Sequence, residues 1–367
     1  MRTPDFSRLE ALAGSVLSVT EMPGGASTRR YFRVALPEKT VAGSAEGGTP
    51  QKTMVAMFVP EGGKPEEIAK ETARHRWPFL EVRDLLHASG VDVPALYGED
   101  QDNGWLILED LGDDTLANYL AKNEPARERL YRRAVTDLAR AQKRLEKLPT
   151  DSIVATRAFD ADLLRWEIDH FREWGLEARG HHLSADDRRT FDEIAGRLAS
   201  RIAGWPRGFV HRDYQSRNLM VRPPKTEGGE SLCWIDFQDA LLGPRVYDLV
   251  ALLNDSYQTF DRAFVTGRLN EYAAAMQIEN GDEIVAEGGT AALTLIEQFD
   301  YVTVQRKLKD AGRFVFIERM KGNDSFLRFV TPTIRKVREA LGRLSSRDTD
   351  MKALQSLLKR TLPDEFG

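Results

Sequence analysis

The alternation of apolar and polar residues in the first third of the chain predicts a small β-sheet. Short runs rich in β-branched and aromatic residues, separated by turn-forming residues, are typical of strands. Five such runs are present, at residues 15–21, 30–36, 53–59, 91–97 and 104–108. A longer stretch with helical spacing, residues 65–89, lies between the third and the fourth run. Together they predict a five-stranded sheet accompanied by one helix.

Beyond residue 115 the spacing of apolar residues becomes helical. Apolar residues recur every three or four positions over residues 130–145 and 159–176, with charged residues between them, which predicts two amphipathic helices. A buried helix is predicted to begin at Tyr247, and Thr331 followed by Pro332 suits the N-cap and first position of a late helix. The second part of the chain is therefore predicted to be mainly helical.

Candidate catalytic side chains lie between two short apolar strands. The strand at residues 208–210 leads into His211-Arg212-Asp213, and Asn218 follows in the same loop. The runs at residues 219–221 and 232–235 predict a hairpin, which would bring Asn218 and Asp236 to one edge. The sequence therefore predicts that two carboxylates and one amide share a site.

This set of side chains is the one that phosphoryl transfer requires. The spacing H-R-D-x-x-x-x-N matches a kinase catalytic loop, and Asp236-Phe237 stands where kinases have Asp-Phe-Gly. In that interpretation Asp213 accepts the proton of a substrate hydroxyl, while Asn218 and Asp236 hold Mg²⁺ bound to nucleotide phosphates. The alternative is a polar turn in which His211 belongs to the core and Asp236 caps a helix.

Two further segments suggest nucleotide contacts. The small residues of the turn before the second predicted strand would let backbone N–H groups approach a phosphate, with Ser27, Thr28 and Arg30 as additional donors. This turn is not a G-x-G-x-x-G motif, and an ordinary hairpin is the alternative. Glu109 and Leu111 lie in a segment that resembles the hinge where adenine binds backbone groups. The alternative there is a strand-to-helix turn capped by Asp113 or Asp114.

Composition and charge narrow the class of protein. The chain has 367 residues, enough for two lobes with their own cores, and a net charge of −5. It lacks the basic character of a nucleic-acid binder, and no apolar run approaches the length of a membrane span. Its single cysteine, Cys233, excludes an intrachain disulfide. We expect a cytoplasmic monomer with neither a nucleic-acid nor a membrane partner.

Three segments of the chain resemble the aminoglycoside phosphotransferase-like, or choline-kinase-like, branch of the protein-kinase superfamily. They are the catalytic loop, Ile235-Asp236-Phe237 and Gly243-Pro244-x-x-Tyr247-Asp248-Leu249. The resemblance implies an α+β, bilobal protein-kinase-like fold. Residues 1–110 would form a small antiparallel N-lobe that binds nucleotide, and residues 111–367 a larger, mainly helical C-lobe. It also implies ATP and Mg²⁺ as cofactors. Asp248 is structural in that family, and its position also suits an N-cap.

A narrower resemblance, over roughly residues 20–345, is to the bacterial anomeric kinases of cell-wall amino sugars. It is carried by Ala26-Ser27-x-Arg29-Arg30-Tyr31-Phe32-Arg33, Leu108-Glu109-Asp110-Leu111-Gly112, the catalytic loop with Ile235-Asp236-Phe237-Gln238-Asp239-Ala240, and Gln305-Arg306-x-Leu308-Lys309-x-x-Gly312-x-Phe314. It implies phosphorylation of the C1 hydroxyl of N-acetylmuramic acid, N-acetylglucosamine or both during peptidoglycan recycling. The alternative acceptors are an aminoglycoside, a choline-like amine or a methylthioribose-type sugar.

Sugar recognition requires hydrogen-bonding side chains and an aromatic platform. Glu173 and Trp174, on the stretch 159–176, could provide both, and Arg217 is a further candidate. Arg306 and Lys309 could bind the lactyl carboxylate that N-acetylmuramate has and N-acetylglucosamine lacks. The alternative is a solvated helix face with Trp174 as packing.

One position departs from the general kinase pattern. Met57 stands where a kinase strand carries the lysine that binds nucleotide phosphates, and Glu81 is the candidate for the helix carboxylate that would pair with it. Arg30, Arg33 or loop N–H groups could supply the missing donors. The substitution also motivates a different class of function, a nucleotide-binding pseudokinase.

Overall fold

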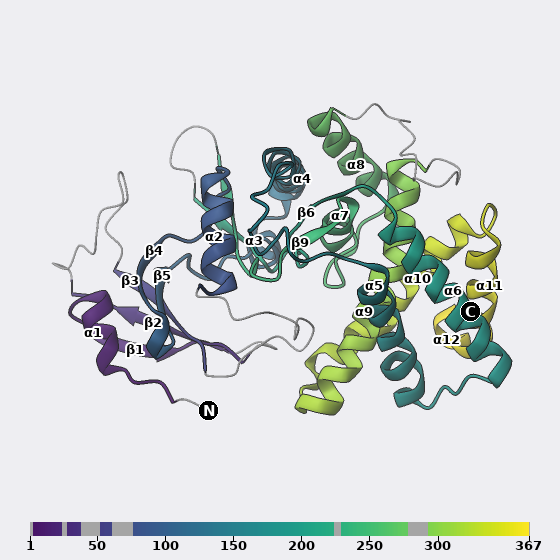
Figure 1. Ribbon diagram of the computed structural model, residues 1–367, viewed down its shortest axis with the longest axis horizontal. Helices are drawn as coiled ribbons and strands as arrows, with labels where there is room; N and C mark the ends of the chain where they lie inside the picture. Colours follow the sequence, from purple (N-terminus) through teal and green to yellow (C-terminus); the bar gives the residue numbers. More distant parts are fainter. Residues whose placement is uncertain are drawn as a thin grey trace.

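The computed structural model describes residues 3–23, 28–37, 52–60, 76–223, 229–277 and 293–366. Figure 1 shows a sheet-containing lobe on the left and a larger, helical lobe on the right. Within the described residues, no helix combines the length and the apolar character needed to cross a membrane.

The N-lobe is built on a five-stranded antiparallel sheet with strand order β1-β2-β3-β5-β4, which confirms the predicted sheet. Its elements are α1 (Ser7–Ala13), β1 (Ser18–Glu21), β2 (Arg30–Ala35), β3 (Thr53–Phe58), α2 (Pro78–Ala88), β4 (Leu96–Asp100), a single turn (Gln101–Asn103) and β5 (Trp105–Glu109). The fourth strand begins later than predicted, after Pro94, which has no N–H to donate to the sheet. Of the predicted helix 65–89, residues 65–75 lie outside the described part, and α2 begins at Pro78.

The two faces of this sheet belong to different cores. On one face α1, which the sequence pattern did not predict, places Leu9 against a cluster that includes Phe32 and Trp105. On the other face, Met57 and Leu106 join a core that continues through α2 into the C-lobe. The N-lobe therefore shares the core on the α2 side of its sheet with the C-lobe, whereas the core on the α1 side is formed by N-lobe residues.

The C-lobe is mainly helical, as predicted (Figure 1), and it also contains two two-stranded antiparallel sheets. Its helices are α3 (Leu116–Lys122), α4 (Arg127–Arg144), α5 (Ala161–His170), a π-helical segment (Phe171–Leu176), α6 (Ala185–Ala203), α7 (Val246–Leu253), α8 (Arg262–Met276), α9 (Leu295–Lys321), α10 (Val330–Leu344), α11 (Thr349–Thr361) and α12 (Pro363–Phe366), with shorter turns at Glu124–Ala126, Glu177–Arg179 and Asp324–Phe329. Its strands are β6 (Arg207–Val210), β7 (Leu219–Arg222), β8 (Ser231–Trp234) and β9 (Leu241–Pro244).

The strand pairing around the catalytic loop confirms the predicted hairpin and adds a partner. β7 and β8 pair antiparallel, with Leu219 opposite Trp234. β6 pairs with β9, which the sequence pattern did not single out as a strand. The loop that carries Asp213 therefore runs from one two-stranded sheet into the other.

Two predicted helix caps are wrong. Thr115 caps α3 by accepting the N–H of Asn118 at 3.2 Å, so neither Asp113 nor Asp114 does. Helix α10 already begins at Val330, which places Thr331 inside its first turn instead of at the N-cap. In both cases the observed N-cap, Thr115 or Phe329, lies within two residues of the predicted one, where sequence signals are least decisive.

Candidate active site

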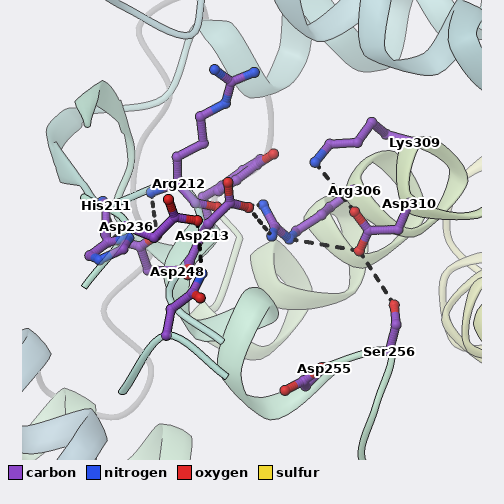
Figure 2. A network of polar contacts seen from close by, with 12 residues as sticks. His211, Arg212, Asp213, Asp236, Asp248, Asp255, Ser256, Arg306, Lys309 and Asp310 are labelled. Atoms are coloured by element: carbon purple, nitrogen blue, oxygen red, sulfur yellow. Dashed lines mark hydrogen bonds and ion pairs between the residues drawn. The ribbon is translucent and has the colours of Figure 1, made fainter. Parts of the chain in front are cut away.

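The loop between β6 and β7 presents Asp213 beside Asp236, which follows β8 (Figure 2). Arg212 and Asp236 have φ angles of 79° and 64°, in the left-handed region that costs energy for residues with a side chain. Such conformations persist where surrounding contacts enforce them, and they gather at functional sites. Asn218 links the two carboxylate residues: its Nδ2 lies 2.9 Å from the Asp213 carbonyl oxygen and 3.4 Å from Asp236 Oδ2. The three residues predicted to perform the chemistry thus lie together.

Asp248 holds this loop in place from helix α7. Its buried carboxylate accepts the N–H of His211 at 2.7 Å and that of Arg212 at 3.0 Å. Arg245 occupies the N-cap of α7, so the interpretation of Asp248 as a cap is wrong. Burial raises the pKa of Asp248 to about 7, although the two N–H donors oppose that rise. The interaction is structural, because the carboxylate points toward the backbone of the loop and not into the site.

Asp236 and Asn218 fit a divalent cation. The Asp236 carboxyl is accessible to solvent and accepts a hydrogen bond from Gln238 Nε2 at 3.0 Å. Desolvation by the surrounding protein raises the pKa of Asp236, and the negative charge of Asp213 raises it further. A bound cation would favour the ionised carboxylate against both effects. The described residues contain no cluster of three His, Cys, Asp or Glu side chains suited to a metal. Mg²⁺ does not need one, because it commonly uses one or two protein ligands together with phosphates and water.

Asp213 has the environment of an ionised base. Its side chain is 34% exposed, and its Oδ1 lies 3.2 Å from Arg306 Nη2. Burial raises the pKa of Asp213, but the positive charges of Lys309, Arg306 and Arg212 outweigh burial and hold the pKa below its usual value. The carboxylate is therefore ready to accept a proton at neutral pH.

The two residues predicted to bind a substrate carboxylate occupy different positions. Arg306 lies behind the base: its side chain is only 2% exposed, and both of its terminal nitrogens already donate to protein oxygens. That geometry leaves a substrate carboxylate no direct access to Arg306. Lys309 lies further along α9, with its Nζ 3.3 Å from Asp310 Oδ1, and Figure 2 shows its amine on the side of Asp213.

Two of the predicted nucleotide residues, Arg30 and Glu109, pair with charged side chains of the protein. Ser27 lies outside the described residues, and Thr28 is exposed at the edge of a described segment. Arg30 forks onto Glu21 of the neighbouring strand, with both distances 2.8 Å. Glu109 accepts two hydrogen bonds from the Arg222 guanidinium, one of them from Nη2 to Oε2 at 2.7 Å. Leu111 is half-buried just after the sheet ends. Their roles toward a nucleotide stay predictions.

Arg29 is a candidate that the sequence reasoning passed over. Its positive charge opposes the rise in the pKa of Asp236, so it acts on the site from the N-lobe. It lies two positions before Tyr31, which pairs with Met57 in the sheet, and residues two apart in an extended chain share a face. Because Met57 is fully buried, Arg29 provides a positive charge near the place where the kinase lysine is missing. The alternation of strand faces was the signal that could have identified it.

The predicted sugar residues gather less tightly. Trp174 meets Phe316 of α9 edge to face, at 5.1 Å between ring centroids, and both rings pack around His170. Trp166, 42% exposed, also packs on His170, at 5.5 Å between ring centroids. These four residues form an aromatic cluster between α5, the π-helical segment and α9. Glu173 is exposed beside Trp174 and lies 3.6 Å from Arg172.

Arg217 stands at the exposed end of the catalytic loop. Its guanidinium lies 3.6 Å from the centroid of the Tyr257 ring, a cation–π contact. Tyr257 follows Asp255, whose buried carboxylate accepts the N–H of Ser216 at 3.0 Å. The exposed arginine is therefore attached to a loop that is itself anchored.

Comparison with known proteins agrees with this geometry. Residues 18–282 match the phosphotransferase enzyme family. The N-acetylmuramate/N-acetylglucosamine kinase of Pseudomonas aeruginosa is 30% identical, over 87% of this chain and 82% of that protein. The protein of the same name from Neisseria meningitidis serogroup B is 30% identical, over 93% of this chain and 89% of that protein.

Solved structures share the fold at low sequence identity. The choline kinase of Streptococcus pneumoniae gives a TM-score of 0.54 at 15% identity, covering 93% of this chain and 97% of that one. The GDP complex of wild-type aminoglycoside 2'-phosphotransferase-IIIa also gives a TM-score of 0.54, at 13% identity, covering 91% and 95%. These likenesses confirm the bilobal, kinase-like α+β fold.

Proposed function

We propose an amino sugar as the acceptor for this chain, which belongs to the phosphotransferase enzyme family and is a phosphotransferase acting on a hydroxyl group. The reaction would transfer the γ-phosphoryl group of ATP to the C1 hydroxyl of N-acetylmuramate, N-acetylglucosamine or both. The observation that carries the proposal is the pairing of an ionised Asp213 with the Asn218–Asp236 pair, in a chain whose relatives carry that kinase name.

Asp213 would orient the attacking hydroxyl and accept its proton. The anomeric hydroxyl of a sugar is more acidic than an ordinary alcohol, so a carboxylate with a depressed pKa is a sufficient base. The partial exposure of Asp213 suits this role, because a substrate can reach one side of the carboxylate while Arg306 contacts the other. The proton then resides on the Asp213 carboxyl until product leaves.

Asn218 and Asp236 would hold Mg²⁺. The Asn218 Nδ2 group contacts protein oxygens, so the amide oxygen is the atom available to a cation. When bound, Mg²⁺ neutralises charge on the nucleotide phosphates. Arg29 would add a positive charge from the N-lobe, in place of the lysine absent at Met57. The other proposed nucleotide neighbours are Ser27, Thr28, Arg30, Glu109 and Leu111. Glu109 and Leu111 would contact the nucleotide through their backbone groups.

Lys309 is the proposed contact for the lactyl carboxylate of N-acetylmuramate. Of the two cations first considered, it is the one whose amine faces the base without being enclosed behind it. Trp174 and the rest of the aromatic cluster would provide an apolar surface for a sugar ring, with Glu173 and Arg217 as polar neighbours.

The test is ADP release from Mg-ATP with N-acetylmuramate, N-acetylglucosamine, choline and kanamycin, followed by phosphorus NMR of the product. A 1-phosphate of either amino sugar, lost when EDTA removes Mg²⁺, supports the proposal. Turnover only with choline or kanamycin would keep the chemistry and reassign the acceptor. ATP binding without turnover of any acceptor would favour the pseudokinase alternative.

A further inference from the structure

Arg306 contacts two different parts of the segment that carries the base. Its Nη1 donates to the carbonyl oxygen of Arg212 at 2.7 Å, and its Nη2 donates to Asp213 Oδ1 at 3.2 Å (Figure 2). One guanidinium therefore fixes both the backbone just before Asp213 and the carboxylate itself. A planar fork can do this because its donors diverge at a fixed angle.

The Arg212 residue is held on both sides. Its N–H donates to Asp248 at 3.0 Å, while its carbonyl accepts from Arg306. Between these contacts its φ is 79°, a conformation that a non-glycine residue adopts only under restraint. Loss of either contact would let the peptide relax and would turn the Asp213 side chain away from its present direction.

Arg306 is itself held by a buried network. Its guanidinium lies 4.6 Å from the centroid of the Tyr247 ring, whose hydroxyl donates to Glu167 Oε2 at 3.2 Å. The same Glu167 oxygen accepts from Gln305 Nε2 at 2.8 Å, and Glu167 Oε1 lies 3.5 Å from Arg212 Nη2. Glu167 is completely buried. Helices α5, α7 and α9 thus all contribute to the position of one carboxylate.

We propose that Arg306 is the positioning residue of Asp213, and that its fork, more than its charge, sets the geometry of the base. This inference rests on the proposed function in one respect, namely that Asp213 is the base. Lysine at this position would keep the charge but could not reach the Arg212 carbonyl and the Asp213 carboxylate with two divergent donors. A misplacement of about 1 Å in a reacting group costs roughly 10²-fold in rate.

The test is steady-state kinetics of Arg306→Lys, alone and combined with Asp213→Asn. We expect kcat to fall by about 10²-fold, with KM for sugar and for ATP changed by less than about threefold. Because both residues act through the same carboxylate, the double variant should be no slower than Asp213→Asn. Unchanged kcat in folded Arg306→Lys, or losses that multiply in the double variant, would overturn the proposal.

The matched control is Arg343→Lys, which alters another guanidinium that forks onto a buried carboxylate, Asp300, with both distances 2.9 Å. It should lower the melting temperature without a selective loss of kcat. If Arg306→Lys does not fold, Glu167→Gln loosens the same network from a distance. Its loss of kcat should vanish in the Asp213→Asn background, and persistence of that loss would contradict the proposal.

Failure of this inference is distinguishable from failure of the proposed function. If the wild-type protein turns over none of the amino sugars, the proposed acceptor is wrong before any variant is compared, and the comparison proceeds with whichever acceptor supports turnover. If the wild-type protein is active on a sugar and Arg306→Lys is equally active, the acceptor stands and the positioning role falls.

Discussion

Glu109, the last residue of β5, forks onto Arg222 of β7 and so ties the N-lobe sheet to the catalytic hairpin. Both side chains are largely buried, and Arg222 also lies 3.0 Å from Asp92. Glu109 in addition accepts the N–H of Ala95 at 3.1 Å. This pair therefore stands at the connection between the lobes, where the sequence suggested only a nucleotide contact for Glu109.

Arg222→Met should destabilise the protein by about 1–3 kcal/mol, because it leaves a largely buried carboxylate without its partner. The measurement is the free energy of unfolding from urea titration. Lys122→Met is the control, since its ion pair with Asp114 is exposed and should contribute less than about 0.5 kcal/mol. Equal effects of the two substitutions would show that the Glu109–Arg222 pair contributes no more to the free energy of unfolding than an exposed ion pair does.

Asp213→Asn should reduce kcat by about 10²-fold or more while leaving nucleotide affinity intact, because the amide cannot accept the hydroxyl proton. The readout is turnover with the preferred acceptor together with the dissociation constant for ATP. Full activity in this variant would remove Asp213 from the role of base.

Arg29→Gln should lower kcat/KM for ATP by about tenfold, since it removes one cation from beside the phosphate region. Arg8→Gln, on α1, should change it little, because Arg8 lies 3.9 Å from the exposed Asp5 and has no proposed role toward the nucleotide. If the two variants behave alike, Arg29 has no specific role toward the nucleotide.

His211 should make stability depend on pH. Burial lowers its pKa to about 4 from an ordinary 6.5, so between these values the unfolded chain binds more protons and the contribution of His211 is lost as pH falls. Asp248, with its pKa raised to about 7, has the opposite sign: its contribution is lost as pH rises toward 7.

Comparison with His211→Phe separates the contribution of His211 from that of Asp248, because this variant keeps an aromatic ring but has no group that titrates at this position. The free energy of unfolding of wild type minus variant should rise between about pH 4 and pH 6.5 and then level off. Urea titrations across that range measure it. A difference independent of pH would mean that folding does not lower the pKa of His211.

Lys309→Gln should raise KM for N-acetylmuramate by about tenfold and leave N-acetylglucosamine nearly unaffected, because only the former carries a carboxylate. The two sugars are assayed with the same enzyme preparation. Equal changes in KM for both sugars would show that Lys309 acts through Asp213 and not by binding the substrate carboxylate.

The proximity of the three candidate side chains could be predicted because its signal is local. Asp213, Asn218 and Asp236 lie within one loop and one hairpin, and strand pairing follows from short apolar runs and turn residues. The N-lobe sheet was predictable for the same reason. Here local backbone preferences agree with the final fold.

The supporting contacts could not be predicted, because they join distant parts of the chain. Arg306 reaches Asp213 across 93 positions, and Gln305 reaches Glu167 across 138. Nothing in the spacing of these residues distinguishes a side chain behind the base from one in front of it. For Asp248 the resemblance implied a structural role and the local pattern also allowed an N-cap, because a helix-opening aspartate and a loop-anchoring aspartate look identical in sequence.

The continuity of one core through both lobes has a consequence for building hybrid enzymes. Phe79 of α2 stacks on Phe237 at 5.1 Å, next to Asp236, so the helix of the small lobe packs directly on the catalytic segment. A chimera that joins this N-lobe to the C-lobe of a relative would keep the α1 side of the sheet intact and create a mismatched seam at Phe79. Grafts intended to exchange nucleotide preference should therefore carry α2 and the segment around Phe237 together.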